Sequence, residues 1–309
     1  MGGAQAEPSP SDGSRGISVG TLLFAVSAGI CVQVLVLLTQ SGGNPVDALC
    51  YWLTDPANPY NRTEYQFVYP PVAAQIMGPL FTLPFEVFTA FLRVVEVVSL
   101  IVLAGPLAGA LIFATPVAAE INAANINLLI GVVMVLGFRW PALWVIPLLT
   151  KPSMGIGLVW FLIRGEWRKA AIPVAIVAVL AAVSFVFAPH LWFDWLALLA
   201  GGTAETGEWP YPYPIWVRLP IALAIVVWGA RTNRPWTIVL ASALALPRLY
   251  YQSPAILVAM IPLIPPLGRL VAPWTRRLGR LDDITSLHRA KGDGAVVAVD
   301  QPHATPGTP

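Results

Sequence analysis

The chain has 309 residues, of which 57% are hydrophobic and only 11% are charged. Soluble domains carry about 25% charged residues, so a soluble fold of this composition would expose much apolar surface to water. An ordinary cytosolic protein is therefore excluded, and the mean hydropathy of +0.70 indicates a polytopic membrane protein. The net charge of +2, with scattered basic residues, is too small to indicate a nucleic-acid partner.

The chain begins with a polar stretch, residues 1–16, whose Gly, Ser and Pro content predicts a disordered tail. The apolar stretch 17–39 is too long for a signal-peptide core and predicts a retained transmembrane helix. A polar segment, 40–71, separates it from an almost continuously apolar region that prolines punctuate. The predicted segments of that region are Val72–Leu83, Val87–Ala104, Leu107–Ala119, Leu128–Phe138, Ala142–Thr150 and Met154–Ile163.

Several of these segments are shorter than the ~20 residues that a helix needs to cross a bilayer. Some must therefore be broken or re-entrant, which is tolerated only where protein or a cavity covers the backbone. We expect an all-α, polytopic transmembrane bundle over residues 17–271 with about eight to ten membrane segments. The polar stretch 272–309 predicts a disordered cytoplasmic tail. The later membrane segments are Ala171–Phe187, Pro214–Gly229, Pro235–Leu246 and Pro254–Leu270.

Loop charge predicts the orientation of the chain in the membrane. Three basic clusters alternate with loops that are mainly acidic, and the positive-inside rule places the clusters in the cytoplasm. The segment 40–71, the loop 189–218 and the turn around Arg248 then face outward, and both termini are cytoplasmic. Between residues 72 and 163 the charges do not fix the orientation. The clusters are Arg164, Arg168 and Lys169; Arg231 and Arg234; and Arg269, Arg276, Arg277 and Arg280.

The outward segment 40–71 interleaves carboxylate and aromatic side chains and is longer than a simple connector. Asp47 and Tyr51 stand four residues apart, so a short helix would put both on one face. Asp55, Tyr60 and Tyr69 follow, the last of them directly before a Pro-Pro pair. The segment is therefore a candidate site, and the alternative is a solvated loop with tyrosines at the membrane interface.

Polar residues inside apolar runs form a second group of candidates, because an ionisable residue within a membrane is a functional candidate by default. For Arg93 and Glu96, three residues apart, we favour a structural ion pair. For Lys151 the alternative is snorkelling to an interface. We favour a function for it, because Pro152 frees backbone groups and indicates a broken helix that lines a cavity. The other members are Glu120, Asn122, Asn125 and Asn127.

The third group lies in the later outward loops. The aromatic stretch 189–216 predicts a segment along the membrane surface, in which Asp194 has an interface role. His190 is a lone loop histidine, which is usually not a catalytic base. Arg248 sits at an outer helix end, where it could hold a phosphate. The sequence has no Walker motif, no dinucleotide fingerprint, no HExxH and no Cys/His cluster, so we predict no metal and no nucleotide cofactor.

Taken in order, these motifs resemble those of the GT-C glycosyltransferases, and most closely glycosyltransferase family 87, the polyprenyl-phosphate-mannose-dependent mannosyltransferases. That family has an Asp and a Tyr after the first span, a Pro-Tyr, a Phe/Leu-x-Tyr-Pro-Pro, an Asn-rich step, a Lys-Pro and an Arg-x-x-Trp-Arg turn. The resemblance covers about residues 17–188. The matching positions are Asp47 with Tyr51, Pro59-Tyr60, Phe67-Val-Tyr69-Pro70-Pro71, Asn125-Ile-Asn127, Lys151-Pro152 and Arg164-Gly-Glu-Trp-Arg168.

The resemblance implies a GT-C-like fold and transfer of a hexose, by this likeness mannose, from a polyprenyl-phosphate donor to a lipid or glycan acceptor. The reaction would take place at the outer face of the plasma membrane, with no cofactor besides the lipid-linked donor. Asp47 would be the general base, and Lys151 and Arg248 would stabilise the phosphate. The resemblance implies donor or acceptor binding for Tyr51, Asp55, Tyr60, Tyr69, Asn125 and Asn127.

Two other hypotheses fit part of the sequence. A transporter or lipid flippase would also use discontinuous helices and intramembrane charges, and it predicts matching broken segments in two halves of the chain. A non-catalytic membrane subunit would pack against a true glycosyltransferase. The short chain favours it, as does Ala123-Ala124 in the region where family 87 has Gly-Gln.

Overall fold

The computed structural model describes residues 18–201 and 213–275, and all regular elements within these residues are helical. The predicted all-helical fold is therefore confirmed for this part of the chain. The predicted tail 1–16 and most of 272–309 lie outside it, while α14 continues beyond the predicted domain boundary at residue 271. The elements are α1 (Val19–Ser41), α2 (Val46–Trp52), α3 (Pro71–Phe81), α4 (Phe85–Ala104), η1 (Gly105–Leu107), α5 (Ala108–Leu111), α6 (Thr115–Ala123), α7 (Asn127–Leu136), η2 (Pro141–Trp144), α8 (Val145–Thr150), η3 (Pro152–Leu158), α9 (Val159–Ile163), α10 (Trp167–Phe187), α11 (Pro189–Ala200), α12 (Ile215–Arg231), α13 (Thr237–Leu244), η4 (Ser253–Leu263) and α14 (Pro265–Thr275).

Three helical stretches are long and apolar enough to cross a membrane: α1, α4 continued to Leu111, and α10. Two further pairs pass the same test together but are bent, α6–α7 by 105° and η4–α14 by 84°, which gives up to five spans. These helices indicate a membrane protein. By the criteria of length and composition, the described residues thus contain fewer spans than the eight to ten membrane segments that we expected. Helices such as α3 and α13 are too short to cross a membrane alone.

The long helices differ in how they are covered. α4 lies among α1, α2, α6, α7 and η4, whereas α1 and α10 keep most of their apolar side chains exposed. On α1 only Ser27 and Cys31 are buried. The Ser27 hydroxyl accepts a hydrogen bond from the Gly109 N–H at 2.6 Å, and a Cβ on Gly109 would lie 2.9 Å from the Ser27 Cα. A small residue thus permits this close approach, as is common between membrane helices.

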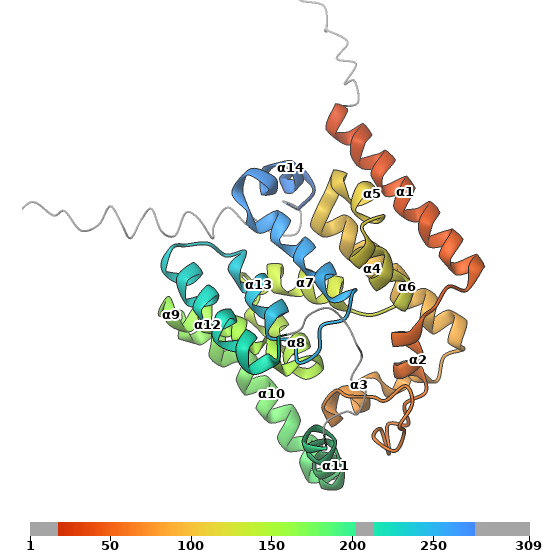
Figure 1. Ribbon diagram of the computed structural model, residues 1–309, viewed down its shortest axis with the longest axis vertical. Coiled ribbons are helices and arrows are strands. Elements are labelled where there is room, and N and C mark those ends of the chain that lie inside the picture. The colour runs from red at the N-terminus through yellow and green to blue at the C-terminus, as the bar shows by residue number, and fades with distance from the viewer. Residues whose placement is uncertain (1–17, 202–212, 276–309) are drawn as a thin grey trace, which may run out of the picture.

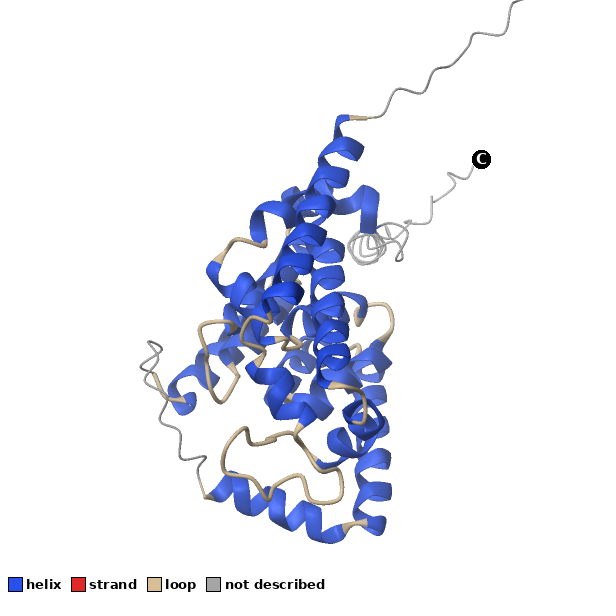
Figure 2. Ribbon diagram, turned by 90° about the vertical axis from the view of Figure 1, so that its right-hand side faces the viewer, coloured by secondary structure: helices blue, strands red, loops and turns tan. Residues whose placement is uncertain are grey.

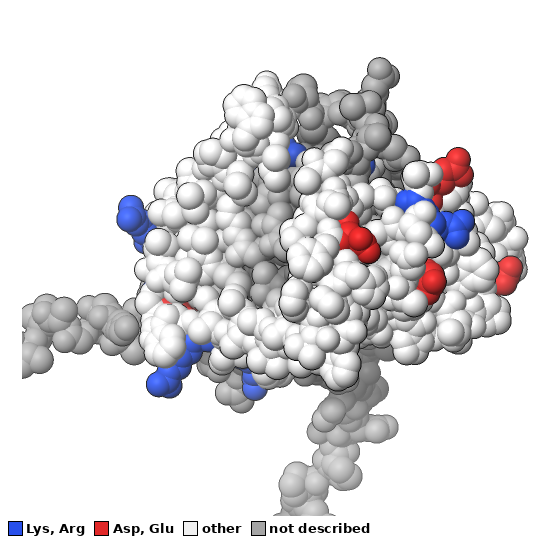
Figure 3. Space-filling model, turned by 90° about the horizontal axis from the view of Figure 1, so that it is seen from below, with Lys and Arg blue, Asp and Glu red and all other residues white. Residues whose placement is uncertain are grey.

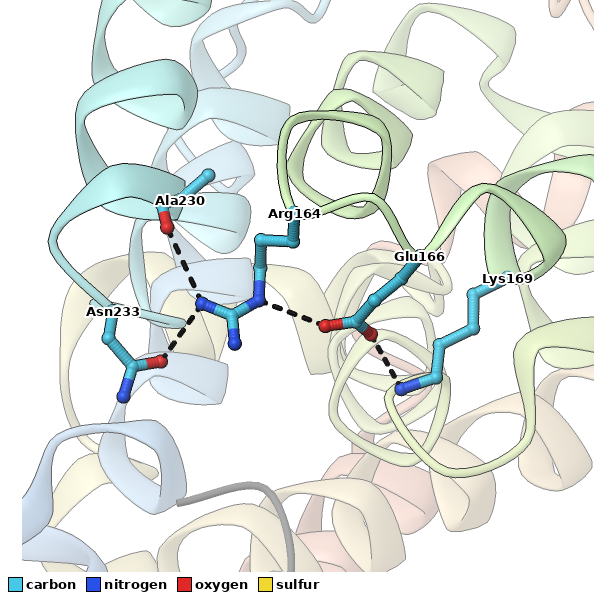
Figure 4. Close-up of polar contacts among 5 residues, drawn as sticks. All are labelled: Arg164, Glu166, Lys169, Ala230 and Asn233. Carbon is cyan, nitrogen blue, oxygen red and sulfur yellow. Dashed lines mark hydrogen bonds and ion pairs between the residues drawn. The ribbon is translucent and has the colours of Figure 1, made fainter. Parts of the chain in front are cut away.

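The two basic loops that flank α10 and α12 lie side by side (Figure 4). Arg164 donates to Glu166 Oε1 at 3.0 Å and to Asn233 Oδ1 at 3.2 Å, and Lys169 is 2.7 Å from Glu166 Oε2. Burial opposes ionisation of Glu166, but the bonds from Lys169 and Arg164 hold the pKa of its carboxyl below the usual value. The first two basic clusters therefore occupy one end of the helical bundle.

The peripheral spans α1 and α10 have a common direction, and the surface charges are unevenly distributed (Figures 1 and 3). α1 and α10 run the same way in both views, toward the end where α2, α3 and α11 lie (Figures 1 and 2). Seen from that end, acidic groups gather mainly over one side of the molecule and basic groups mainly at the opposite edge (Figure 3). The exposed carboxylates of the described residues include Asp55, Glu64, Glu86 and Asp194.

α11 is the first part of the aromatic stretch 189–216, for which we predicted a position along the membrane surface. It turns across the end of α10 (Figure 2), and Leu191 is its only buried residue. Trp195 donates from Nε1 to the Val68 carbonyl at 3.2 Å, which connects α11 with the outward segment. His190 and Asp194 on this helix are exposed. Residues 202–212 of the stretch lie outside the described residues, and its end, 213–216, leads into α12.

Candidate functional site

The outward segment begins with a tight turn that two polar side chains hold in place. Arg93, on α4, donates from Nη1 to the Leu38 carbonyl at 3.0 Å and from Nη2 to the Gly42 carbonyl at 2.9 Å. Gly43 has a φ of +58°, and a Cβ there would overlap the Asn122 amide oxygen and lie 2.8 Å from Arg93 Nη2. A glycine is therefore required at this position, and the turn leads the chain directly into α2.

The Arg93 contacts correct the expectation of an ion pair between Arg93 and Glu96. Arg93 bonds carbonyl oxygens, whereas Glu96 accepts from the backbone N–H groups of Leu128 and Leu129 at 3.2 and 3.1 Å. A carboxylate is favoured there because the first N–H groups of a helix have no partner within the helix, and these belong to α7. Within the described part of the chain, the ion pairs are those of the Arg164 loop.

Asp47 lies in the first turn of α2 and is partly buried. Gln252 Nε2 donates to Asp47 Oδ2 at 3.3 Å across 205 residues of sequence. Burial raises the pKa of the Asp47 carboxyl, while the charge of Lys151 and the Gln252 bond oppose that increase. Asp47 is thus a carboxylate with stronger basicity than an exposed one, and it still has two groups that favour its ionised form.

Tyr51 and Tyr69 form a buried chain of hydroxyl groups beside Asp47. The Tyr51 hydroxyl donates to Asn125 Oδ1 at 3.0 Å. Because its one proton is used there, the Tyr69 hydroxyl donates to the Tyr51 oxygen at 2.8 Å. Burial raises the pKa of both tyrosines, so they remain neutral hydrogen-bonding groups. Tyr60 is not part of this row of hydroxyl groups but holds the Tyr69 backbone, since the Tyr60 hydroxyl donates to the Tyr69 carbonyl at 2.8 Å.

The bend between α6 and α7 carries the second half of the site. Ala124, with a left-handed φ of +53°, ends α6, and α7 begins at Asn127. The buried Glu120 carboxylate accepts from the Asn127 N–H at 2.6 Å and from Asn127 Nδ2 at 2.9 Å. This arrangement directs Asn127 Oδ1 toward Lys151, whose Nζ donates to it. The Asn-rich step is therefore the bend between two apolar helices, and side-chain hydrogen bonds hold it.

Lys151 is half-buried, and its ammonium group bonds a side chain of another helix, Asn127 on α7. Lys151 follows α8 as its C-cap with φ −134° and ψ 74°, outside the α region that a residue before proline disfavours, and η3 starts at Pro152. The ammonium group lies within electrostatic range of Glu120, Asp47 and Glu96. The ammonium group of Lys151 thus connects the base candidate Asp47 with the α6–α7 bend.

Not every predicted site residue joins this group. Asp55 is exposed, and its Oδ1 accepts from the Ala57 N–H at 2.9 Å, which is a turn cap. Arg248 is partly buried in the connection between α13 and η4, four residues before Gln252. The buried Arg218 holds that connection by donating to the Leu246 and Pro247 carbonyls at 2.7 and 2.9 Å.

Sequence reasoning named Glu120 as a candidate without its partner, and it missed Gln252. Glu120 was visible as a carboxylate in an apolar run, but only the structure places both of its oxygens on Asn127. Gln252 had no signal in the sequence, and its partner is on the first outward segment. Its Oε1 is buried and has no hydrogen-bond partner.

Together these side chains form a polar site with one basic carboxylate, one buried cation and several neutral hydroxyl and amide groups. Such a set can accept a proton at Asp47 and stabilise a negative charge near Lys151. The described residues contain no group of three or more His, Cys, Asp or Glu side chains arranged to hold a metal ion. Comparison with family models, with curated proteins and with solved structures finds no match to this chain.

Proposed function

We propose that this chain is a membrane glycosyltransferase of the GT-C type, similar to family 87. It transfers a hexose, by that resemblance mannose, from a polyprenyl-phosphate donor to a lipid or glycan acceptor. The observation that carries the proposal is the meeting of Asp47, Gln252 and Lys151 beneath the outward segment. A carboxylate base and a buried cation side by side are what a sugar transfer with a phosphate leaving group requires.

The proposed reaction is a single displacement. An acceptor hydroxyl attacks the anomeric carbon, and its proton passes to the Asp47 carboxylate. The bond between the anomeric carbon and the phosphate oxygen breaks, and polyprenyl phosphate leaves with the electron pair. Lys151 stabilises the charge that develops on that oxygen. Arg248, four residues before Gln252 in the connection between α13 and η4, is the second cation proposed for the phosphate. One displacement inverts the configuration at the anomeric carbon.

The proposed site is external and the proposed termini are cytoplasmic, in the plasma membrane. This orientation is supported by the two basic loops that Arg164 joins, and by the common direction of α1 and α10 away from the N-terminal end (Figure 1). The shorter helices would complete a polytopic bundle around the bent pairs, where protein covers the backbone. The apolar groove for the polyprenyl chain would lie among these segments, facing the lipid.

A transporter or lipid flippase is the second candidate, because a specific observation favours it. Two helix pairs are bent, α6–α7 and η4–α14, and buried carboxylates lie at the first bend. Broken helices with ionisable groups are typical of transport sites. The outward segment with its base candidate favours transfer over transport.

The test is sugar transfer by purified protein in liposomes that contain a radiolabelled polyprenyl-phosphate mannose donor. Asp47→Asn keeps the shape of the side chain and can still accept the Gln252 bond, but it removes the basicity. It should lose about 10²- to 10⁴-fold in turnover, as loss of a general base does. Asp55→Asn is the matched control, because Asp55 is exposed and caps a turn.

Three outcomes would contradict parts of the proposal. If Asp47→Asn turns over like the parent while Asp55→Asn or Asp194→Asn does not, the base is elsewhere. If the parent moves the lipid across the bilayer without transferring sugar, the protein is a flippase. If the folded parent does neither until another protein is added, it is a non-catalytic subunit.

A further inference from the structure

The amide group of Gln252 is a strong candidate for a role beyond the proposed base and cation. Its side chain is buried, with 5% of its surface exposed, and comes from the start of η4. Nε2 donates to Asp47 Oδ2, whereas Oε1 is buried without a hydrogen-bond partner. Buried polar atoms are nearly always bonded, so an exception calls for a specific explanation.

The orientation of this amide is fixed by its neighbour. A flipped amide would place Oε1 against the Asp47 carboxylate, where two acceptors would face each other. Asp47 therefore selects the observed orientation, with the nitrogen toward the carboxylate and the oxygen turned away from it. The group that would satisfy Oε1 must be a hydrogen-bond donor. This donor must also lie close to Asp47, because the two atoms of a single amide group would bond the donor and the carboxylate.

We infer that Gln252 Oε1 accepts a hydrogen bond from a hydroxyl group of the sugar substrate, and that Gln252 thereby selects for that hydroxyl while it orients Asp47. This inference rests on the proposed function and names a specificity residue for it. Sugars present hydroxyl donors on every face, so a hydroxyl is the natural partner for an unpaired amide oxygen beside a base. The hydroxyl belongs either to the donor hexose or to the acceptor, and the chemistry of recognition is the same.

Specificity would arise from the cost of leaving Oε1 unpaired. A site that is built to bond a hydroxyl rejects an analogue that lacks it, because the buried acceptor then has no partner. A penalty of this kind corresponds to roughly a 5- to 150-fold loss in kcat/KM. The same hydroxyl should become unimportant once Oε1 is removed, and this dependence separates recognition from a purely structural role.

The experiment measures kcat/KM in liposomes for the parent and for Gln252→Leu with a panel of deoxy sugars. One arm uses polyprenyl-phosphate mannose and its monodeoxy derivatives as donors with an unmodified alkyl mannoside. The other arm uses the unmodified donor with monodeoxy alkyl mannosides. We expect one deoxy position, in one arm, to cost the parent roughly 5- to 150-fold and to cost Gln252→Leu less than threefold.

Gln75→Leu, a half-buried glutamine on α3, is the control and should keep the deoxy penalty of the parent. Gln252→Met is the second variant if Gln252→Leu does not fold, and thermal melting checks both. The inference is overturned if every deoxy penalty in both arms is the same in Gln252→Leu and the parent. Absence of sugar transfer by the folded parent would instead refute the proposed function.

Discussion

Replacement of Lys151 by methionine is the perturbation whose consequences the structure defines most fully. Methionine has a similar length but carries no charge. The change removes the donor to Asn127 Oδ1 and the one buried cation close to Asp47 and Glu120. It should therefore affect the binding of an anionic donor and the basicity of Asp47, and these two effects are measured separately.

The effect on donor binding follows from the strength of a charged hydrogen bond. Such a bond contributes about 1.5 to 3 kcal/mol, which corresponds to about a 10- to 150-fold loss of affinity. Lys169→Met is the matched control. Lys169 is a lysine of the same charge that pairs with Glu166, in the basic loop beside Arg164. Titration of each protein with polyprenyl phosphate in liposomes should show the loss in Lys151→Met alone.

The effect on pH dependence has a definite sign. Asp47 acts as a base only when it is ionised, so turnover falls as the pH drops through its pKa. Burial already raises that pKa, and the charge of Lys151 opposes the increase. Lys151→Met removes the opposing charge, so the acid limb of the kcat profile should move to higher pH. Lys151→Arg keeps the charge, and its limb should stay near that of the parent.

The reasoning about Lys151 has a clear refutation. A folded Lys151→Met protein with unchanged affinity for polyprenyl phosphate and an unchanged acid limb would show that the lysine is only a structural partner of Asn127. Loss of folding alone would not support the phosphate role, since an uncompensated buried carboxylate is itself destabilising. A melting curve therefore accompanies each titration.

Two further predictions concern the glycine turn between α1 and α2 and the orientation of the chain in the membrane. Gly43→Ala should lower the free energy of unfolding by about 1–3 kcal/mol or more, because a left-handed residue there also meets Asn122. Gly42→Ala also places a side chain at a positive φ, +75°, but in open space, and an equal loss in both would contradict the steric argument; thermal melting compares them. In a cysteine-free background, a thiol placed at the exposed Asn58 should be labelled from outside, and one at Thr232 from the cytoplasmic side. Labelling of both from one side would refute the topology.

The sequence could predict the elements of the site that depend on local patterns. The four-residue spacing of Asp47 and Tyr51 puts both on one face of any short helix there, and the structure has such a helix, α2, from Val46. The Pro-Pro pair after Tyr69 starts α3, since proline is favoured in a first turn. The Lys151-Pro152 step predicts a break, and α8 ends there. Each of these signals arises from backbone preferences within a few residues.

The partners of the polar side chains could not be predicted in the same way. Arg93 and Glu96 are three residues apart on one helix, which favours a pair, yet each bonds backbone groups of other elements. Open helix ends provide several carbonyl or N–H partners in fixed positions, and these compete with a single opposite charge. The contact between Gln252 and Asp47 depends on packing between the two ends of the chain, and no short-range pattern encodes it.

The same physical rule explains how the site is held together. Arg93 bonds the last carbonyl groups of α1 at the turn that leads into α2, and Arg218 bonds the carbonyl groups after α13 that lead toward η4. Asp47 follows the first of these turns, and Gln252 follows the second. Each buried guanidinium satisfies helix-end carbonyls that have no partner within their helices, and in doing so it fixes where the next segment starts. The two segments that meet at the carboxylate are thus each anchored a few residues away by a charge that takes no part in the chemistry. This is the support that a precise polar site requires when it is built on loops and short helices.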